Sequence, residues 1–147
     1  MQIKCTINAK ELIFDAEVTT RALDIIRELG FTSVKEGCGE GECGACSLFF
    51  NGKLINSCLL LVPQMQDAKI VTLEGMQEET KLLRENFEKS GAIQCGFCTS
   101  GFVLRGQDYI THEHNKDAKA IQDALDGNLC RCTGYQKIIE AVQKSMK

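Results

Sequence analysis

Apolar and polar residues alternate at the start of the chain, a pattern typical of β-strands that bury one face. Two such runs are separated by Asn8-Ala9-Lys10, which supplies a turn, so the pattern predicts a β-hairpin. The apolar positions of the two runs are Ile3, Cys5 and Ile7, followed by Leu12, Phe14 and Ala16.

The spacing then changes to that of an amphipathic helix, which Thr19 or Thr20 could cap and which runs to Leu29 before Gly30 ends it. Further along, Asn51-Gly52 is a strong short-range signal for a hairpin turn. The strands predicted on either side of this turn and after it are Ser47–Phe50, Lys53–Asn56 and Lys69–Leu73.

The second half of the chain shows helical periodicity, with apolar residues on one face of each segment. The predicted helices are Thr80–Ser90, a stretch around Cys98–Ile110, Asp117–Asp126 and Tyr135–Met146. We place a boundary near Gly75–Glu79, which divides the chain into domains of residues 1–76 and 77–147. The pattern therefore predicts an α+β protein with a mixed first domain and a helical second domain.

Composition excludes several functional classes. The 147 residues are 44 % hydrophobic, which allows a packed core, and a net charge of −3 gives no support for nucleic-acid binding. No apolar run approaches the roughly 20 residues of a membrane span. The N-terminal segment does not resemble a secretory signal, so we expect the chain to remain in the cytoplasm. Nine cysteines in that reducing compartment indicate metal or redox chemistry rather than disulfides.

The first cysteine set has the spacing C-x4-C-x2-C-x11-C, and its first three members match the plant-type [2Fe–2S] pattern. Three thiolates from one loop converge on a compact cluster only if the backbone folds back tightly, and glycines in the loop allow this. Their N–H groups can then hydrogen-bond the cluster sulfurs. The cysteines are Cys38, Cys43, Cys46 and Cys58, and the glycines are Gly37, Gly39, Gly41 and Gly44.

Two other interpretations of this loop are weaker. Residues 39–44 satisfy G-x-G-x-x-G, but a dinucleotide site needs a strand directly before that motif and a helix directly after it. Here a predicted helix precedes the motif and a hairpin follows it. A structural zinc site favours two C-x2-C pairs, and only Cys43 and Cys46 form one.

A second cysteine set has the spacing C-x2-C-x31-C-x-C. The first pair would share one face at the start of a helix, and the second pair would point the same way on an extended segment. One alternative is that the four cysteines are buried structural thiols without a metal. Taken alone, this set is also compatible with zinc. The first set in the same chain favours iron. The residues are Cys95, Cys98, Cys130 and Cys132.

Three stretches carry a resemblance to a known family. Residues 36–46 (EGCGEGECGAC) resemble the first-cluster loop of the molybdenum hydroxylases, and residues 94–99 (QCGFCT) and 127–135 (GNLCRCTGY) resemble their second-cluster motifs. The three stretches occur in the right order, and the resemblance covers nearly the whole chain. The chain is similar to the small iron–sulfur subunits of the xanthine dehydrogenase and carbon monoxide dehydrogenase type.

This resemblance implies a plant-ferredoxin-like β-grasp domain followed by a four-helix domain, with two [2Fe–2S] clusters held by the eight cysteines of the two sets. It also implies partners: a large subunit that binds molybdopterin and a medium subunit that binds FAD. The helical-domain cluster then lies close to the molybdopterin, and the other cluster lies towards the flavin. Gln94 matches a glutamine that hydrogen-bonds the pterin, and Cys132 matches the ligand nearest to the pterin.

Several residues need a separate interpretation. Ser100 stands where relatives often have proline, which we expect to leave ligation unchanged. His112 and His114 would face different sides of a helix, so we expect a solvated loop there. Cys5, the ninth cysteine, belongs to the first alternating run and is expected to be buried. The acidic residues of the first loop either lower the potential of its cluster or are merely solvated: Glu36, Glu40 and Glu42.

The expected function is electron transfer within a molybdenum hydroxylase, from the molybdopterin site through two clusters to FAD or another acceptor. No residue of this chain is expected to be catalytic. By analogy we favour a purine or another N-heterocycle as the substrate, with an aldehyde- or carbon monoxide-oxidising enzyme as the alternative. A free-standing two-cluster ferredoxin is the competing function. The balanced charge of the second half argues against it, because such carriers dock through charged patches.

Overall fold

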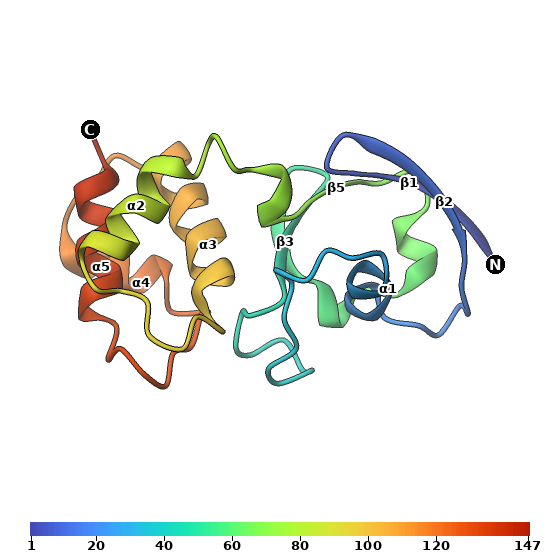
Figure 1. The fold of residues 1–147 in the computed structure, drawn as a ribbon, viewed down its shortest axis with the longest axis horizontal. Helices are drawn as coiled ribbons and strands as arrows, with labels where there is room; N and C mark the ends of the chain where they lie inside the picture. The colour runs from blue at the N-terminus through green and yellow to red at the C-terminus, as the bar shows by residue number, and fades with distance from the viewer.

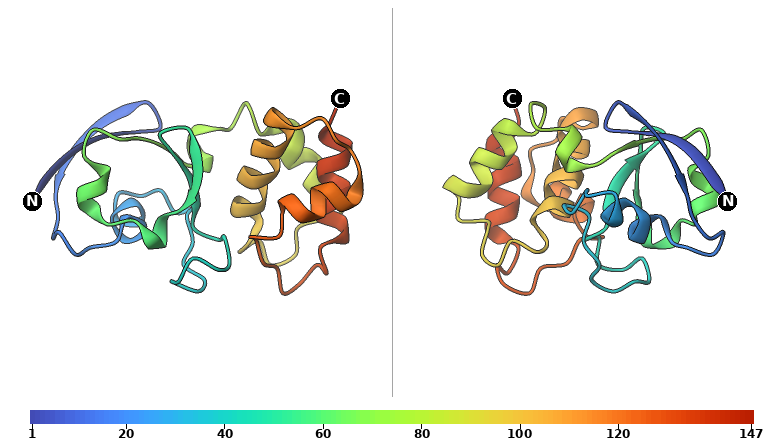
Figure 2. Two further views of the ribbon diagram at one scale, coloured as in Figure 1. Left: turned by 180° about the vertical axis from the view of Figure 1, so that it is seen from behind. Right: turned by 45° about the vertical axis from the view of Figure 1, so that its right-hand side comes forward.

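The computed structural model describes residues 1–147 and shows an elongated molecule with two lobes (Figure 1). One lobe contains a sheet and the N-terminus, and the other contains a group of helices and the C-terminus (Figure 2). Each lobe has its own hydrophobic core. This arrangement confirms the predicted α+β class. None of the helices combines the length and the apolar character that a membrane span requires.

The N-terminal lobe is a five-stranded mixed sheet with the strand order β2-β1-β5-β3-β4. Strands β1 and β5 run parallel, and the other neighbouring strands are antiparallel. The strands are β1 (Gln2–Ile7), β2 (Lys10–Asp15), β3 (Ser47–Phe50), β4 (Lys53–Asn56) and β5 (Lys69–Val71). Both hairpins follow the sequence-based prediction, because their registers are set by local turns.

Helix α1 (Ala22–Glu28) packs its apolar face against this sheet. Leu23 and Ile26 are fully buried, as are Ile3 and Ile7 of β1. Each such side chain contributes about 1.5–3 kcal/mol through removal of apolar surface from water. Three short 3₁₀ segments complete the lobe: η1 (Ser57–Leu59), η2 (Val62–Met65) and η3 (Leu73–Gly75).

Asn8 ties the first hairpin turn to the chain that leaves β5. It adopts a left-handed φ of 51°, which asparagine tolerates better than most residues. Its Nδ2 donates to Thr72 Oγ1 at 2.9 Å, and its Oδ1 accepts from the Thr72 N–H at 2.9 Å. The side chain therefore links two segments that are far apart in the sequence.

Replacing Asn8 by alanine is expected to lower the free energy of unfolding by about 1–3 kcal/mol, because both hydrogen bonds are lost and Thr72 keeps an unpaired N–H. Denaturant unfolding measures this change. Asn8→Asp retains an acceptor for the Thr72 N–H and should lose less. An alanine variant as stable as the parent protein would show that these bonds contribute nothing.

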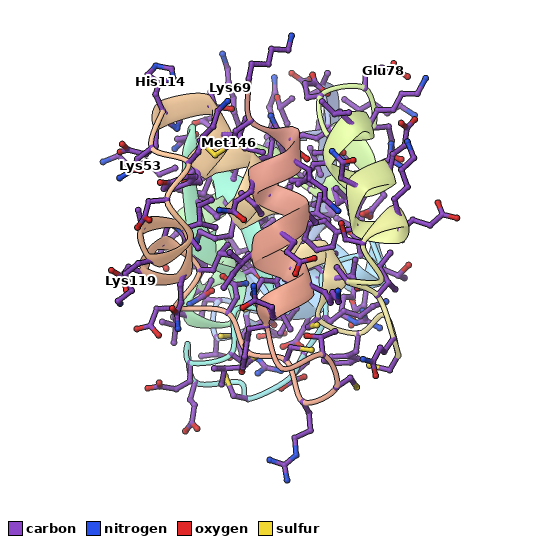
Figure 3. The ribbon with its side chains drawn as sticks, turned by 90° about the vertical axis from the view of Figure 1, so that its left-hand side faces the viewer. Lys53, Lys69, Glu78, His114, Lys119 and Met146 are labelled. Atoms are coloured by element: carbon purple, nitrogen blue, oxygen red, sulfur yellow. The ribbon has the colours of Figure 1, made fainter.

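The C-terminal lobe consists of four helices, as the sequence predicts. They are α2 (Lys81–Lys89), α3 (Thr99–His112), α4 (Ala118–Ala124) and α5 (Gln136–Ser145). Their apolar faces meet in a core that includes Phe87, Phe102 and Val142. Figure 3 looks onto this lobe with α5 in front, and the charged side chains of Glu78 and Lys119 lie at its margin.

Some local expectations are wrong. Arg21, and neither Thr19 nor Thr20, is the N-cap residue of α1, and no side chain caps that helix. The last strand ends at Val71, because the following residues turn into η3. Both ends lie within one or two residues of the expected ones, the range over which element ends commonly vary.

In the C-terminal lobe, the structure differs from the sequence-based expectation at the two ends of helix α3. It begins at Thr99 with Cys98 as its N-cap residue, so Cys95 precedes the helix and does not share a face with Cys98 on it. His112 is the last residue of α3 rather than part of a loop. His114 does lie in an exposed connection, as expected, and points outward in Figure 3.

The two lobes meet where α3 packs on β3 and β4. Gly101, in the first turn of α3, lies so close to the main chain of Gly44 that a methyl group on it would overlap the Gly44 carbonyl oxygen. Next to it, Ser100 Oγ donates to the carbonyl oxygen of Ser33 at 2.5 Å. Ser100 therefore joins the lobes, a contact that proline at this position would not make.

Candidate metal centres

The first cysteine loop directs three backbone N–H groups at one sulfur atom. Cys38 Sγ accepts from the backbone N–H groups of Glu40 at 3.4 Å, Glu42 at 3.2 Å and Cys43 at 3.4 Å. These bonds lower the pKa of the Cys38 thiol to about 7, and the bond from the Glu40 N–H has the largest effect. Such a nest of donors stabilises negative charge on sulfur. The loop reaches this shape because three of its glycines adopt left-handed φ values, namely Gly39, Gly41 and Gly44.

The other end of the first set is buried. Cys46 and Cys58 are 2 % and 6 % exposed, and both lie in the core of the sheet lobe. Burial first, and the neighbouring Cys46 thiol second, raise the pKa of the Cys58 thiol to about 11. Ser57 Oγ donates to the Cys46 carbonyl oxygen at 2.8 Å and holds the two cysteine segments together.

Two ion pairs of Arg21 connect helix α1 to the base of the first loop. Arg21 Nη1 lies 2.8 Å from Glu36 Oε1, and Arg21 Nη2 lies 2.8 Å from Asp24 Oδ1. The hydrogen bond from Arg21 lowers the pKa of the Glu36 carboxyl. All three acidic residues of the loop are exposed, but Glu36 is paired with Arg21, whereas Glu40 and Glu42 form no ion pair. The three acidic residues therefore do not act as one group.

The second cysteine set combines two turns of the helical lobe. Cys95 and Cys98 flank Gly96, whose φ is 84°, directly before α3. Burial first, and the neighbouring Cys130 thiol second, raise the pKa of the Cys98 thiol to about 12. Cys132 is exposed, and its thiol lies beside that of Cys95, which raises its pKa.

Cys130 carries the hydrogen bonds of the second set. Its Sγ accepts from the Cys132 N–H at 3.4 Å, the Thr133 N–H at 3.3 Å and the Thr133 hydroxyl at 3.1 Å. Burial raises the pKa of this thiol, but the bonds from Thr133 and Cys132 outweigh burial and lower it overall. Cys130 is therefore the counterpart of Cys38 in the first set.

The two sets lie close together at the junction of the lobes. The N–H of Leu129 donates to the carbonyl oxygen of Cys43 at 2.9 Å, and Asn128 Nδ2 donates to that of Gly44 at 3.2 Å. Main-chain atoms and one hydrogen bond thus connect Cys43 of the first set with Cys130 of the second.

A cavity of about 220 Å³ opens at this junction, and its lining tests whether a cluster fits. All four thiols of the second set line it, together with Cys43. A [2Fe–2S] cluster takes two pairs of thiolates, one pair on each iron. The neighbouring thiols provide such pairs in both sets: Cys38 with Cys43, Cys46 with Cys58, Cys95 with Cys132, and Cys98 with Cys130. The donor sets therefore suit [2Fe–2S] clusters.

Zinc is the alternative metal that the sequence leaves open for the second set. A structural zinc ion needs four ligands around one point. The structure contains no group of three or more His, Cys, Asp or Glu side chains arranged to hold a single metal ion. His112, which the sequence singled out, instead lies 3.2 Å from Asp108 Oδ1 on the same helix.

The remaining candidate residues divide into exposed and buried positions. Gln94 is exposed and directly precedes Cys95 of the second set. Cys5 is 2 % exposed in β1, as predicted, and burial raises the pKa of its thiol. Sequence reasoning missed Thr133 and Asn128, although both stand within the stretch 127–135 that carries the resemblance. Their position beside the cysteines was the available signal.

Comparison with known proteins gives a consistent result. Residues 5–69 match the model of the 2Fe-2S iron-sulfur cluster binding domain, and residues 72–143 match that of the [2Fe-2S] binding domain. The nicotinate dehydrogenase small FeS subunit of Eubacterium barkeri is 43 % identical over 148 residues, covering 99 % of this chain and 94 % of that subunit.

Two further relatives agree. The xanthine dehydrogenase iron-sulfur-binding subunit of Escherichia coli O157:H7 is 42 % identical and covers 95 % of this chain and 91 % of that subunit. A chain in the crystal structure of quinoline 2-oxidoreductase from Pseudomonas putida 86 superposes with a TM-score of 0.91 at 36 % identity, covering 97 % of this chain and 90 % of that one. This chain, with its two [2Fe–2S]-binding domains in series, therefore belongs to the family of small iron–sulfur subunits of molybdenum hydroxylases.

Proposed function

We propose that this chain conducts electrons one at a time through two [2Fe–2S] clusters inside a molybdenum hydroxylase. Cys38, Cys43, Cys46 and Cys58 hold the first cluster, and Cys95, Cys98, Cys130 and Cys132 hold the second. The observation that carries the proposal is the cavity at the lobe junction, where all four thiols of the second set meet Cys43 of the first. We also place the domain boundary between residues 76 and 77.

The clusters supply one-electron redox chemistry when bound. The protein holds their thiolates, shields them from water and directs N–H groups at sulfur. The hydrogen bond from the Leu129 N–H to the Cys43 carbonyl oxygen supports a direct connection between the two centres. Leu129 is covalently bonded to Cys130, so a main-chain path from Cys43 to Cys130 crosses this one hydrogen bond and otherwise follows covalent bonds. Neither set needs a catalytic residue on this chain.

Exposure supports the order of the two centres. Cys95 and Cys132 are exposed, so the second cluster can face a molybdopterin-binding large subunit. Gln94 is exposed beside Cys95. In this proposal it hydrogen-bonds the pterin, and Cys132 is the ligand nearest to the pterin, because both residues match the second-cluster motifs. At the first centre, Leu59 is 63 % exposed beside the loop, which supports contact with a second partner that binds FAD.

The substrate of the whole enzyme is a purine or another N-heterocycle. The support is that the two relatives named above are subunits of a nicotinate and a xanthine dehydrogenase, and the structural neighbour is a quinoline oxidoreductase. The alternative is an aldehyde, because an aldehyde oxidoreductase from Desulfovibrio desulfuricans superposes with a TM-score of 0.89. We place the enzyme in the cytoplasm, where reduced thiols are available for cluster assembly.

Purification of the native complex tests the proposal. We expect about four irons per chain, visible absorption from [2Fe–2S] clusters, and co-elution with molybdenum and flavin. A chain that elutes alone with both clusters would be a free ferredoxin, and that result would overturn the subunit assignment. A colourless protein that contains metal would overturn electron transfer altogether.

A further inference from the structure

One hydrogen bond to sulfur differs in kind from all others in the two cysteine sets. The three bonds to Cys38 Sγ come from backbone N–H groups, which a substitution does not remove. At Cys130 the shortest bond, 3.1 Å, comes from the hydroxyl of Thr133. Apart from the cysteines themselves, Thr133 is the one residue whose side chain hydrogen-bonds a cysteine sulfur in this structure.

The direction of this bond follows from the sulfur, because a thiolate ligand has no proton to donate and can only accept. The N–H of Tyr135 donates to Thr133 Oγ1 at 3.2 Å, which occupies the hydroxyl oxygen as an acceptor. The hydroxyl proton is therefore free to point at Cys130 Sγ. A threonine that donates to a thiolate stabilises negative charge on that sulfur.

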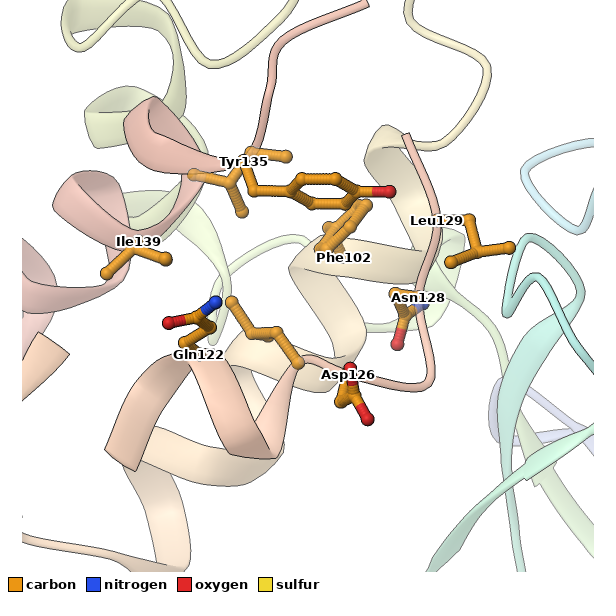
Figure 4. A pocket seen from close by; sticks show the side chains of 9 residues that line it. Phe102, Gln122, Asp126, Asn128, Leu129, Tyr135 and Ile139 are labelled. Atoms are coloured by element: carbon orange, nitrogen blue, oxygen red, sulfur yellow. The ribbon is translucent and has the colours of Figure 1, made fainter. Parts of the chain in front are cut away.

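Tyr135 holds this arrangement in place at some conformational cost. Its φ of 72° and ψ of −30° lie in a region that residues other than glycine rarely adopt. Its ring packs edge-on against Phe102 with the ring centres 6.2 Å apart, and its hydroxyl oxygen accepts from the Cys130 N–H at 3.1 Å. Figure 4 shows the Tyr135 hydroxyl directed at the segment that carries Leu129. Cys130, Thr133 and Tyr135 thus form a closed ring of hydrogen bonds.

We propose that Thr133 sets the reduction potential of the second cluster by donating its hydroxyl to Cys130 Sγ, with Tyr135 as the residue that positions it. The inference rests on the proposed function, since it requires a cluster on Cys130. Reduction adds one electron, received from the molybdenum-containing partner, to the cluster and its thiolates, and it makes or breaks no bond. The hydroxyl stabilises the added charge and therefore raises the potential. That electron leaves to the first cluster.

The test is a redox titration of the native complex, followed by electron paramagnetic resonance so that each cluster reports separately. Thr133→Val is expected to lower the equilibrium constant for reduction of the second cluster roughly tenfold, which corresponds to about 59 mV for a one-electron couple. Thr133→Ser keeps the hydroxyl and should restore the parent potential. The first cluster is an internal reference and should not move.

Thr99 supplies the matched control. It follows Cys98 directly, as Thr133 follows Cys132, but its side chain donates to no sulfur. Thr99→Val should therefore leave the second potential unchanged. Equal potentials in the parent, Thr133→Val and Thr133→Ser proteins would overturn the inference.

Assembly of the cluster separates this inference from the proposed function. If the parent complex lacks a second signal, the proposed ligands are wrong. If the parent has it and both Thr133→Val and Thr133→Ala lose it, Thr133 is needed for assembly and does not act on the potential, which also overturns the inference.

Discussion

Replacing Cys130 by alanine is expected to remove the second cluster and to leave the first one in place, so that iron falls from about four to about two per chain. The large effect follows from the position of Cys130. Its sulfur accepts the three hydrogen bonds from Cys132 and Thr133, and Cys130 lines the junction cavity. Electron flow from the molybdenum-containing partner should stop, because the remaining cluster lies in the other lobe.

Iron analysis together with electron paramagnetic resonance measures this result, and Cys5→Ala is the matched control. Cys5 is equally a cysteine, but it is buried in the sheet core and belongs to neither set. We expect Cys5→Ala to retain about four irons and to lose only some stability through the small cavity that it leaves. A Cys130→Ala protein with both signals intact would exclude Cys130 as a ligand.

Gly101→Ala is expected to lower the free energy of unfolding by about 1–3 kcal/mol, although alanine is the better helix former by about 1 kcal/mol. The added methyl group would overlap the Gly44 carbonyl oxygen and would also press on Asn128 Nδ2. Both groups belong to the contact between the cysteine loops. The substitution should therefore displace the bond between Leu129 and Cys43 and slow electron transfer between the clusters.

Denaturant unfolding and rapid-mixing kinetics of cluster reduction in the complex measure the two effects. Gly127→Ala is the control, because nothing lies within 4 Å of a methyl group there and its φ is not left-handed. It should leave both quantities close to those of the parent protein. A Gly101→Ala variant that is more stable than the parent would contradict the expected overlap with the Gly44 carbonyl oxygen.

The features that the sequence predicts well are those set by neighbouring residues. The Asn51-Gly52 turn fixes the β3–β4 register, and the predicted bounds of both strands agree with the structure. The alternation in β1 places Cys5 in the core correctly. Cysteine spacing identified both sets, and the structure brings the four residues of the second set to one cavity.

The features that the sequence does not predict depend on contacts between distant segments. The bond from Leu129 to Cys43 uses main-chain atoms only, so no residue type signals it. The role of Thr133 depends on the left-handed φ of Tyr135, which residue type does not indicate. Arg21 stands at the N-cap position of α1 in place of the expected threonine, and its side chain pairs with Glu36, fifteen residues further along, instead of capping the helix.

The contact between Gly44 and Gly101 also determines how the chain can be divided. The two lobes have separate cores, which would suggest two modules that could be exchanged or produced alone. A cut between the lobes, however, would expose the carbonyl oxygens of Cys43 and Gly44 and leave Leu129 and Asn128 without their partners. Each cysteine loop thus supplies the hydrogen-bond partners of the other, and the two lobes are expected to fold and assemble as a single unit.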